Sequence, residues 1–268
     1  MLDEFILDKV IEVVREAGKL MLNRDFEVES KGTISNNVTT ADLTVQTYLE
    51  NHLCSLLCDS LFMGEEGNIN HFSHTNQYLW IVDPIDGTAN FIHDIGLSVI
   101  SVGLVKDQKS VLGVVYHPYR NEMFYAEEGK GAFLNGRKVG VSDRDFAHSL
   151  LCTAASLYNK DYAKPCFRVM EKVYAECDDI RRLGSAALEL VYLACGRVEL
   201  YFEIRLFPWD FAAAEIIIRE AGGYVGTIDY DTPVYSRPIP LICANTKENY
   251  EHLKNLVLQE ISVIPYHN

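Results

Sequence analysis

Two aspartates lie three residues apart at the end of an apolar run, in the segment Trp80–Phe91. Asp83 ends the run, Pro84 stiffens the turn, and a glycine and a threonine follow Asp86. At a separation of about 4 Å, two such charges repel by roughly 4 kcal/mol at an effective dielectric of about 20. A divalent cation removes this repulsion and is bound by the same oxygens. Backbone amides after Gly87 could face an anion such as phosphate. The pattern therefore predicts a magnesium-dependent site for a phosphorylated substrate.

Two further carboxylates occupy comparable positions elsewhere in the chain. Glu65 lies in Phe62–Gly67, which we expect to form a glycine-flanked acidic turn, and Asp210 opens a predicted helix. Each acidic residue ends an apolar run or opens a turn, where binding residues are often displayed. Each also has an ordinary explanation: Asp86 could form an Asx turn, Asp210 could cap its helix, and Glu65 could lie in a solvated turn. Taken singly, these residues do not decide between the two kinds of role.

The composition is that of a globular protein with an acidic surface. The 268 residues are 48% hydrophobic, which is enough for a sizeable core. The 38 acidic and 24 basic side chains give a net charge of −14, which argues against nucleic acid and anionic membrane surfaces as partners. A negatively charged substrate would then need local positive charge, which bound metal ions could supply. Solubility alone also explains the acidity.

The seven cysteines do not form a recognisable metal or disulfide motif. Their number is odd and no Cys-x-x-Cys occurs, so we expect free thiols in a reducing compartment. The acidic start Met1–Phe5 lacks the basic region of a secretory signal, and the longest apolar runs are too short to span a bilayer. These features predict a cytoplasmic protein.

Alternating helices and strands must bring the distant carboxylates together. A turn at Asn135 and Gly136 predicts an antiparallel meander, and residues 30–37 are expected to form a loop. This alternation favours an α/β sandwich over a helical bundle. Helices are expected at about residues 3–22, 40–58, 162–177, 185–195, 208–221 and 247–259. Strands are expected at about residues 79–82, 97–105, 111–116, 122–126, 132–134, 150–153, 198–202 and 241–244.

The sequence resembles the inositol monophosphatase family, within the lithium-sensitive, magnesium-dependent sugar phosphatases. Three blocks of that family occur in order, at Gly64–Glu66, Trp80–Phe91 and Pro208–Gly223. Further likeness at Leu134–Gly136, Val141–Ser142 and Arg182–Ala187 extends the resemblance over nearly the whole chain. It implies an α/β (α+β) fold, a layered αβαβα sandwich with mixed, partly antiparallel sheets. We expect a single domain of residues 1–268, in which residues 1–145 approximately form the metal-site half. Residues 146–268 would form the substrate-side half that carries the last metal ligand.

The resemblance also implies a ligand set for two or three Mg²⁺ ions. Glu65, Asp83 and the carbonyl of Ile85 would hold the first ion, and Asp83 would bridge to a second ion held by Asp86 and Asp210. Glu65 would also help to hold a weaker third ion. All these ligands are oxygens, as Mg²⁺ prefers. The nucleophile would be water, without a covalent enzyme intermediate.

The resemblance assigns catalytic and substrate-binding roles to neighbouring residues. Thr88 would orient the attacking water together with Glu65, with Asp42 behind it, although Asp42 could equally be an ordinary acid in the first turn of its helix. Glu203 matches an acid near the inositol hydroxyls, and Ser185 could instead cap a helix. The expected substrate-binding set is Asp86, Gly87, Thr88, Gly184, Ser185, Ala186, Glu203 and Asp210.

Several alternatives stay open at this point. The haloacid dehalogenase phosphatases use Asp-x-Asp-Gly-Thr, but here the two aspartates are three residues apart and the other blocks have no place in that pattern. Fructose-1,6-bisphosphatase and 3′-phosphoadenosine 5′-phosphate phosphatase share the metal blocks, whereas the match at Glu203 favours a neutral polyol. Departures from the family at residues 92–96, 153–156 and 205–207 leave the alcohol open. A catalytically silent scaffold predicts a broken ligand set, and no ligand is missing. Family members are commonly homodimers, so we expect a homodimer.

Overall fold

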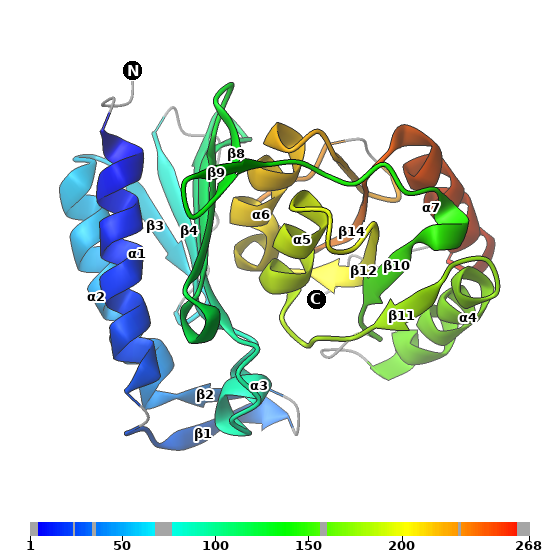
Figure 1. Ribbon diagram of the computed structural model, residues 1–268. Helices are drawn as coiled ribbons and strands as arrows, with labels where there is room; N and C mark the ends of the chain where they lie inside the picture. The colour runs from blue at the N-terminus through cyan, green and yellow to red at the C-terminus, as the bar shows by residue number, and fades with distance from the viewer. Residues whose placement is uncertain are drawn as a thin grey trace.

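Two larger β-sheets alternate with helical layers in the computed structural model of the chain (Figure 1). The structure describes residues 5–23, 25–33, 36–67, 77–155, 160–229 and 232–261. The helices are α1 (Ile6–Leu22), α2 (Thr40–Leu56), α3 (Thr88–Ile92), α4 (Ala163–Tyr174), α5 (Ala186–Ala194), α6 (Pro208–Glu220) and α7 (Lys247–Glu260). The strands are β1 (Val28–Thr33), β2 (Asn36–Thr39), β3 (Leu61–Gly64), β4 (Leu79–Asp86), β5 (Val99–Lys106), β6 (Lys109–His117), β7 (Glu122–Glu127), β8 (Gly131–Leu134), β9 (Arg137–Val139), β10 (Leu150–Thr153), β11 (Asp179–Arg181), β12 (Leu200–Leu206), β13 (Tyr224–Gly226) and β14 (Ile239–Ala244).

Both sheets mix parallel and antiparallel pairs. The first has the order β3-β4-β5-β6-β7-β8-β9, in which only β3 and β4 pair in parallel. Strands β5 to β8 form the predicted antiparallel meander, and β4 and β9 extend it at its two sides. Asn135 and Gly136 turn the chain between β8 and β9 with φ of 48° and 81°. The second sheet has the order β11-β10-β12-β14-β13, with β10 parallel to both of its neighbours and β14 antiparallel to its own.

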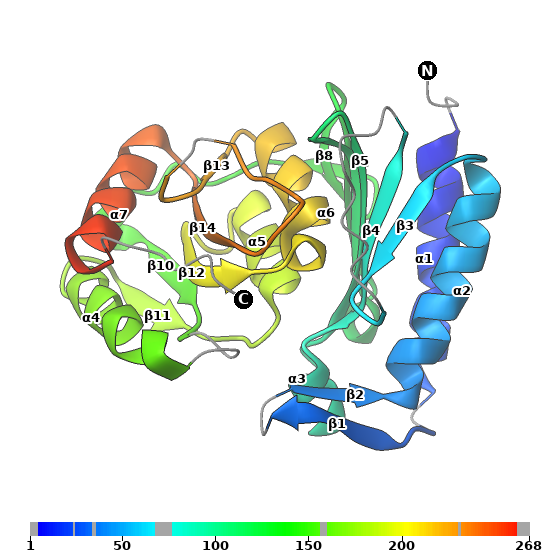
Figure 2. The same cartoon turned by 180° about the vertical axis from the view of Figure 1, so that it is seen from behind.

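Helices cover the faces of both sheets, in five layers. Helices α1 and α2 lie on the outer face of the first sheet, α5 and α6 lie between the sheets, and α4 and α7 cover the far face of the second (Figures 1 and 2). Three apolar cores fill the four spaces between these layers, because one core surrounds α5 and α6 and reaches both sheets. The αβαβα sandwich expected from the sequence is therefore confirmed.

Two glycines set the position of α6, the helix that carries one of the predicted metal ligands. A Cβ atom at Gly113 would lie 2.2 Å from the carbonyl oxygen of Ala213, and one at Gly103 would lie 2.9 Å from the nitrogen of the same alanine. The backbone of α6 therefore lies directly on β5 and β6. This close contact fixes where the first turn of α6, which carries Asp210, meets β4.

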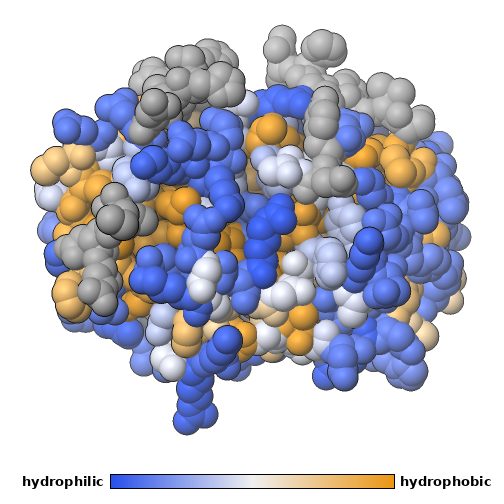
Figure 3. Space-filling model, turned by 90° about the horizontal axis from the view of Figure 1, so that it is seen from above, coloured by the Kyte–Doolittle hydropathy of each residue, from blue (hydrophilic) through white to orange (hydrophobic). Residues whose placement is uncertain are grey.

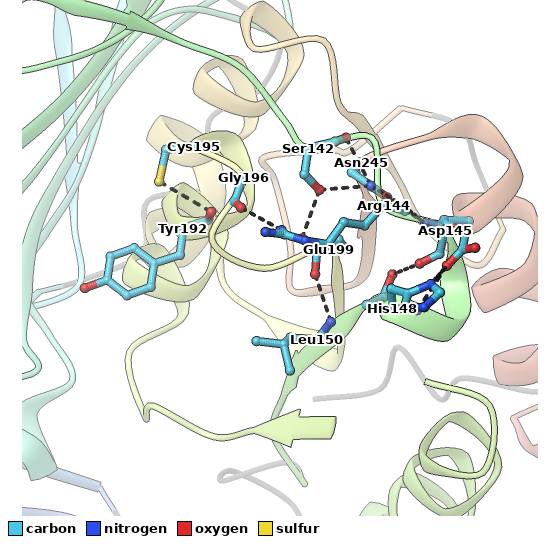
Figure 4. Close-up of polar contacts among 12 residues, drawn as sticks. Ser142, Arg144, Asp145, His148, Leu150, Tyr192, Cys195, Gly196, Glu199 and Asn245 are labelled. Carbon is cyan, nitrogen blue, oxygen red and sulfur yellow. Dashed lines mark hydrogen bonds and ion pairs between the residues drawn. The ribbon is translucent and has the colours of Figure 1, made fainter. Parts of the chain in front are cut away.

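A buried carboxylate fastens the connection between β9 and β10 to the second sheet. Glu199 accepts hydrogen bonds from Ser142 Oγ (2.9 Å), Arg144 Nη1 (2.5 Å) and the backbone N–H of Leu150 (2.8 Å), as Figure 4 shows. Asn245 Nδ2 donates to the carbonyl oxygen of Ser142 at 3.1 Å. Polar contacts therefore hold the crossing segment between the two sheets, in addition to the packing of Val141 and Phe146 on the neighbouring cores.

The loop prediction for residues 30–37 is wrong for residues 30–33 and 36–37, which belong to the two strands of an antiparallel ribbon, while residues 34–35 lie outside the described residues. Val28 pairs with Thr39, Glu29 with Val38 and Ser30 with Asn37. A two-stranded ribbon is held by backbone hydrogen bonds and does not need alternating apolar and polar residues. Because this stretch is polar, the hydrophobic pattern did not predict its strands. The segment Phe62–Gly67 is likewise not all turn, since its first residues belong to β3.

The surface seen from above presents mainly hydrophilic side chains, with hydrophobic ones showing between them (Figure 3). Among the helices of the described ranges, none combines the length and the apolar character that crossing a membrane requires.

Candidate metal centre

Three carboxylates converge where β4 meets the first turn of α6. Asp83 and Asp86 come from β4, and Asp210 comes from α6. Each contributes one oxygen, and these atoms lie within 4.8 Å of one another. All three side chains are buried. The structure thus brings together residues that stand more than a hundred positions apart in the sequence.

A bulge in β4 places both of its aspartates in the cluster. In a regular strand, residues three apart point to opposite faces of the sheet. Here Asp83 pairs with Ser101 and Asp86 pairs with Val99, so β4 has one residue more than β5 between the two pairs. The extra residue reverses the alternation and brings both carboxylates to one side. Pro84 lies within the bulge, where its missing N–H is tolerated.

The N-terminus of α5 holds the carboxylate of Asp86. Its Oδ2 accepts hydrogen bonds from Ser185 Oγ (2.6 Å) and the N–H of Ala187 (2.7 Å), and its Oδ1 accepts from the N–H of Ala186 (3.3 Å). Ser185 occupies the N-cap position, but its side chain does not cap the helix. Asp86 takes that function from a distant strand, and it is therefore not the local Asx-turn residue considered from sequence.

Asp210 both caps its own helix and belongs to the carboxylate cluster. It is the third residue of α6, and its Oδ2 accepts the N–H of Phe207 at 2.6 Å. Pro208 begins the helix at a position where no N–H is needed. The capping role and the cluster role, which the sequence offered as alternatives, occur together in one side chain.

Asp42 and Glu65 lie around this cluster. Asp42 is fully buried in the first turn of α2 and accepts hydrogen bonds from the N–H and Oγ1 of Thr39, at 2.8 and 2.6 Å. Its charge and that of Glu65 both raise the pKa of Asp83. Glu65 is half-buried just after β3, and its N–H donates to the carbonyl oxygen of Val82 at 3.1 Å. Within the described residues, Glu65 stays outside the 4.8 Å group.

Burial and mutual repulsion raise the pKa values of these carboxyl groups. The pKa of Asp83 lies well above its usual range, first because of burial and then because of Glu65, Asp86, Asp210 and Asp42. Burial also raises the pKa of Asp210. It raises the pKa of Asp86 to about 6, against the opposing effect of the hydrogen bonds from α5. Packing several acids into one buried site in this way needs a compensating positive charge.

The turn after β4 is tightly packed. Gly87 has a φ of 91°, and a Cβ atom there would lie 3.1 Å from the carbonyl oxygens of both Gly184 and Leu97. The Oγ1 of Thr88, the first residue of α3, donates to the carbonyl oxygen of Ile85 at 3.2 Å, while the Ile85 side chain is buried in the apolar core. The positive φ and the two nearby oxygens therefore both require glycine at position 87.

The predicted substrate segment lies against this turn. Asn90 Nδ2 donates to the carbonyl oxygens of Leu97 (2.8 Å) and Leu183 (2.7 Å), which joins the turn to residues 183–187. Glu203 is buried on β12 and accepts a hydrogen bond from the Tyr201 hydroxyl at 2.9 Å. Burial raises the pKa of Glu203 to about 7, and the charge of Asp86 adds to this shift.

Two residues of the site were missed from the sequence. Glu189 is buried on α5 and accepts hydrogen bonds from the N–H groups of Leu183 and Gly184, so it holds the predicted substrate segment. A single charge in the apolar helix Ala186–Ala194 was a signal for such a role, because a buried carboxylate needs partners. Gln46 on α2 contacts the backbone beside Glu65, and no local pattern marks it.

The donor set fits a hard divalent cation. Three carboxylate oxygens lie close enough to share an ion, and neither cysteine nor histidine is among them. All-oxygen sites of this kind suit Mg²⁺, Ca²⁺ or Mn²⁺ rather than Zn²⁺. The raised pKa values of Asp83 and Asp210 agree with a site built to hold positive charge.

Comparisons with known proteins identify relatives over most of the chain. A sequence model described as the Inositol monophosphatase family matches residues 3–262. Nus factor SuhB of Escherichia coli (strain K12) is 37% identical over 227 residues, which cover 82% of this chain and 84% of that protein. Inositol monophosphatase 3 of Solanum lycopersicum is 36% identical over 231 residues, with 83% and 85% covered. The solved structure of an IMPase from Thermotoga maritima superposes with a TM-score of 0.84 at 32% identity, over 96% of this chain and 98% of that one.

Proposed function

The chain belongs to the inositol monophosphatase family, and on that premise we propose that it is a Mg²⁺-dependent phosphomonoesterase acting on inositol monophosphate or a related sugar or polyol phosphate. In this reaction a water oxygen bonds to phosphorus and the bond between phosphorus and the alcohol oxygen breaks. The products are inorganic phosphate and the alcohol, which takes up a proton. The observation that carries the proposal is the convergence of Asp83, Asp86 and Asp210 within 4.8 Å.

The proposal assigns the cation positions to residues from both parts of the chain. Asp83, Glu65 and the carbonyl oxygen of Ile85 would hold one ion, and Asp83, Asp86 and Asp210 would hold a second. Glu65 would contribute to a third, weaker position. Bound Mg²⁺ would supply positive charge that stabilises the attacking and leaving oxygens of the displacement. In this proposal, residues 1–145 approximately form the metal-site half, and residues 146–268 form the substrate-side half that carries the last metal ligand.

Side chains near the cluster would prepare the water and the phosphate. Thr88 and Glu65 would orient the water, and Asp42 would support them from α2. The backbone amides of Gly87 and Thr88 would donate to the phosphate, and the φ of 91° at Gly87 is the feature that turns the chain there. The hydrogen bond from Thr88 to Ile85 supports a fixed rotamer for the threonine hydroxyl.

The alcohol would bind along the segment from Gly184 to Ala186 and against Glu203. The Tyr201 hydroxyl donates to Glu203, which leaves the other carboxyl oxygen available for sugar hydroxyls. A buried acceptor of this kind favours a neutral polyol over an alcohol that carries a second phosphate beside it. Fructose-1,6-bisphosphatase activity and 3′-phosphoadenosine 5′-phosphate phosphatase activity are therefore the lesser candidates.

Phosphate release from myo-inositol 1-phosphate, measured with Mg²⁺ and after its removal by EDTA, tests the proposal. Fructose 1,6-bisphosphate and 3′-phosphoadenosine 5′-phosphate complete the panel. We expect Mg²⁺-dependent release that is fastest with inositol or sugar monophosphates. Absence of release from every polyol phosphate in the presence of Mg²⁺ would overturn it.

We also propose that the protein is a homodimer in the cytoplasm. Helix α4 leaves Phe167 and Tyr174 each 60% exposed, one above the other at a spacing of seven residues. All seven cysteines are unpaired thiols, which supports a reducing compartment. Light scattering tests the dimer directly, and the mass of a single chain would exclude it.

A further inference from the structure

The side chain of Gln46 replaces a β-strand partner for the residue next to Glu65. Its Oε1 accepts the N–H of Glu66 at 2.9 Å, and its Nε2 donates to the carbonyl oxygen of the same residue. One amide therefore satisfies both backbone groups of Glu66. The preceding N–H, that of Glu65, donates to Val82 on β4, so Gln46 continues the anchoring of the chain where the sheet ends.

The place of Gln46 in the fold makes this contact rigid. It lies one helical turn after Asp42 on α2, so both side chains share the face of the helix that looks toward the carboxylates. Its side chain is 9% exposed, and α2 begins with a complete capping box at Thr39. A helix that is fixed at its start presents the amide at a defined position relative to β3 and β4.

Gly64 provides the space that the amide occupies. A Cβ atom at this position would lie 2.1 Å from Gln46 Oε1 and 2.9 Å from its Nε2. The φ of Gly64 is not in the left-handed region, so conformation alone does not require glycine there. Gly64 therefore leaves room for the Gln46 amide, and the two residues together allow the contact with the backbone of Glu66.

The chemistry of the contact calls for an amide rather than a carboxylate. The backbone of Glu66 presents one donor and one acceptor, and the neutral amide of glutamine pairs with both at once through its two different atoms. A glutamate would offer no donor and would add another negative charge beside acids that already repel one another. Asparagine is one methylene shorter, so it would not reach as far from α2.

From this geometry we propose that Gln46 is a positioning residue, which sets the place of the Glu65 carboxylate relative to Asp83 and thereby the affinity of the first cation position. The inference rests on the proposed function, because that function assigns Glu65 to the cation. Residues that orient metal ligands without touching the metal commonly change its affinity by about 10- to 100-fold when they are replaced.

Titration calorimetry with Mg²⁺ alone, on the wild type and two variants, tests the proposal. Gln46→Met keeps the volume and removes both hydrogen bonds, whereas Gly64→Ala keeps the glutamine and pushes its amide away. We expect each variant to weaken the tightest Mg²⁺ site by roughly 10-fold or more. In phosphate-release assays, the Mg²⁺ concentration for half-maximal rate should rise by the same factor, while KM for the ester stays within about twofold.

The control is Gln77→Met. The Nε2 of Gln77 also donates to a backbone carbonyl, that of Asp59 at 3.0 Å, but on an exposed surface before β4, away from its carboxylate end. The Mg²⁺ affinity of the Gln77→Met variant should equal that of the wild type. If the wild type itself binds no Mg²⁺, the proposed function fails. If the wild type binds and the folded Gly64→Ala and Gln46→Met variants bind within about twofold of it, the role of Gln46 is refuted while the proposed function stands. Should Gln46→Met unfold, Gly64→Ala decides alone.

Discussion

Replacing Asp83 by asparagine should stabilise the metal-free protein and abolish its response to Mg²⁺. The carboxylate of Asp83 lies within 4.8 Å of those of Asp86 and Asp210. At that distance, two full charges repel by about 3.5 kcal/mol at an effective dielectric of about 20. Asparagine removes the charge and keeps an oxygen that accepts the N–H of Ile85, the 3.0 Å bond that Asp83 makes.

The expected net gain is smaller than the full repulsion, because a raised pKa reduces the average charge that these carboxyl groups carry in the metal-free protein. We expect Asp83→Asn to increase the free energy of unfolding of the metal-free protein by about 1–3 kcal/mol at about pH 8, where more of the acids are ionised than at neutral pH. For a chain of this size, each kcal/mol raises Tm by roughly 2–4 °C. Turnover should be nearly abolished in the same variant, since the proposal gives Asp83 to both cation positions.

Urea unfolding in EDTA and in Mg²⁺, followed by tryptophan fluorescence, provides the measurement, because Trp80 and Trp209 are both buried. Wild type should gain stability from Mg²⁺, whereas Asp83→Asn should not. The exposed Asp143→Asn variant, with the same chemical change outside the site, should behave as wild type in both buffers. An Asp83→Asn protein that is less stable than wild type in EDTA, or that Mg²⁺ stabilises equally, would refute the electrostatic argument.

Three other variants separate the site from its scaffold. Because burial raises the pKa of Glu203 from its ordinary value near 4.5 to about 7, the folded metal-free protein binds more protons than the unfolded chain in that interval and loses stability as pH rises through it. In the Glu203→Gln variant, the free energy of unfolding should fall by about 1–3 kcal/mol less than in wild type as the pH rises from 5 to 8. Urea titrations that show the same pH dependence in both proteins would contradict this expectation. Gly87→Ala should cost about 1–3 kcal/mol and lower kcat, because a φ of 91° and oxygens 3.1 Å away leave no room for a side chain; unchanged kcat would argue against the role of this turn. Glu199→Gln should lower the free energy of unfolding by about 1–3 kcal/mol, since the partners Ser142, Arg144 and Leu150 lose a charged acceptor. Its kcat per folded molecule should match wild type, and a fall in kcat without a fall in stability would be the contrary result.

Much of the framework could be predicted because its signals are local. The apolar periodicity of α1, the Asn135–Gly136 turn and the proline at the start of α6 each act within a few residues, and the corresponding elements are present. The ribbon of β1 and β2 and the short strands β11 and β13 were missed. Strands of this kind depend on partners elsewhere in the chain, which a local pattern does not record.

The candidate site divides in the same way. The family blocks singled out Asp83, Asp86 and Asp210, and their convergence is visible in the structure. By contrast, Gln46 and Glu189 act on backbone groups of distant segments, so their roles emerge only when α2 meets β3 and when α5 meets the preceding loop. Asp86 also holds the backbone of a distant segment, but it stands in a family motif, whereas Gln46 and Glu189 were not marked by any such motif.

For Asp86 and Asp210, a structural role and a metal-binding role were considered as alternatives, but each carboxylate can serve both. Asp210 caps α6 through the N–H of Phe207, and Asp86 accepts two N–H groups at the start of α5, yet both lie in the cluster. Hydrogen bonds from a helix N-terminus favour the charged form of a carboxylate, which opposes the effect of burial. Helix starts therefore keep these two acids more ionised than burial alone would allow. An acid that must bind a cation in a buried place needs such donors, so capping is part of the site's electrostatics and not a competing explanation for the residue.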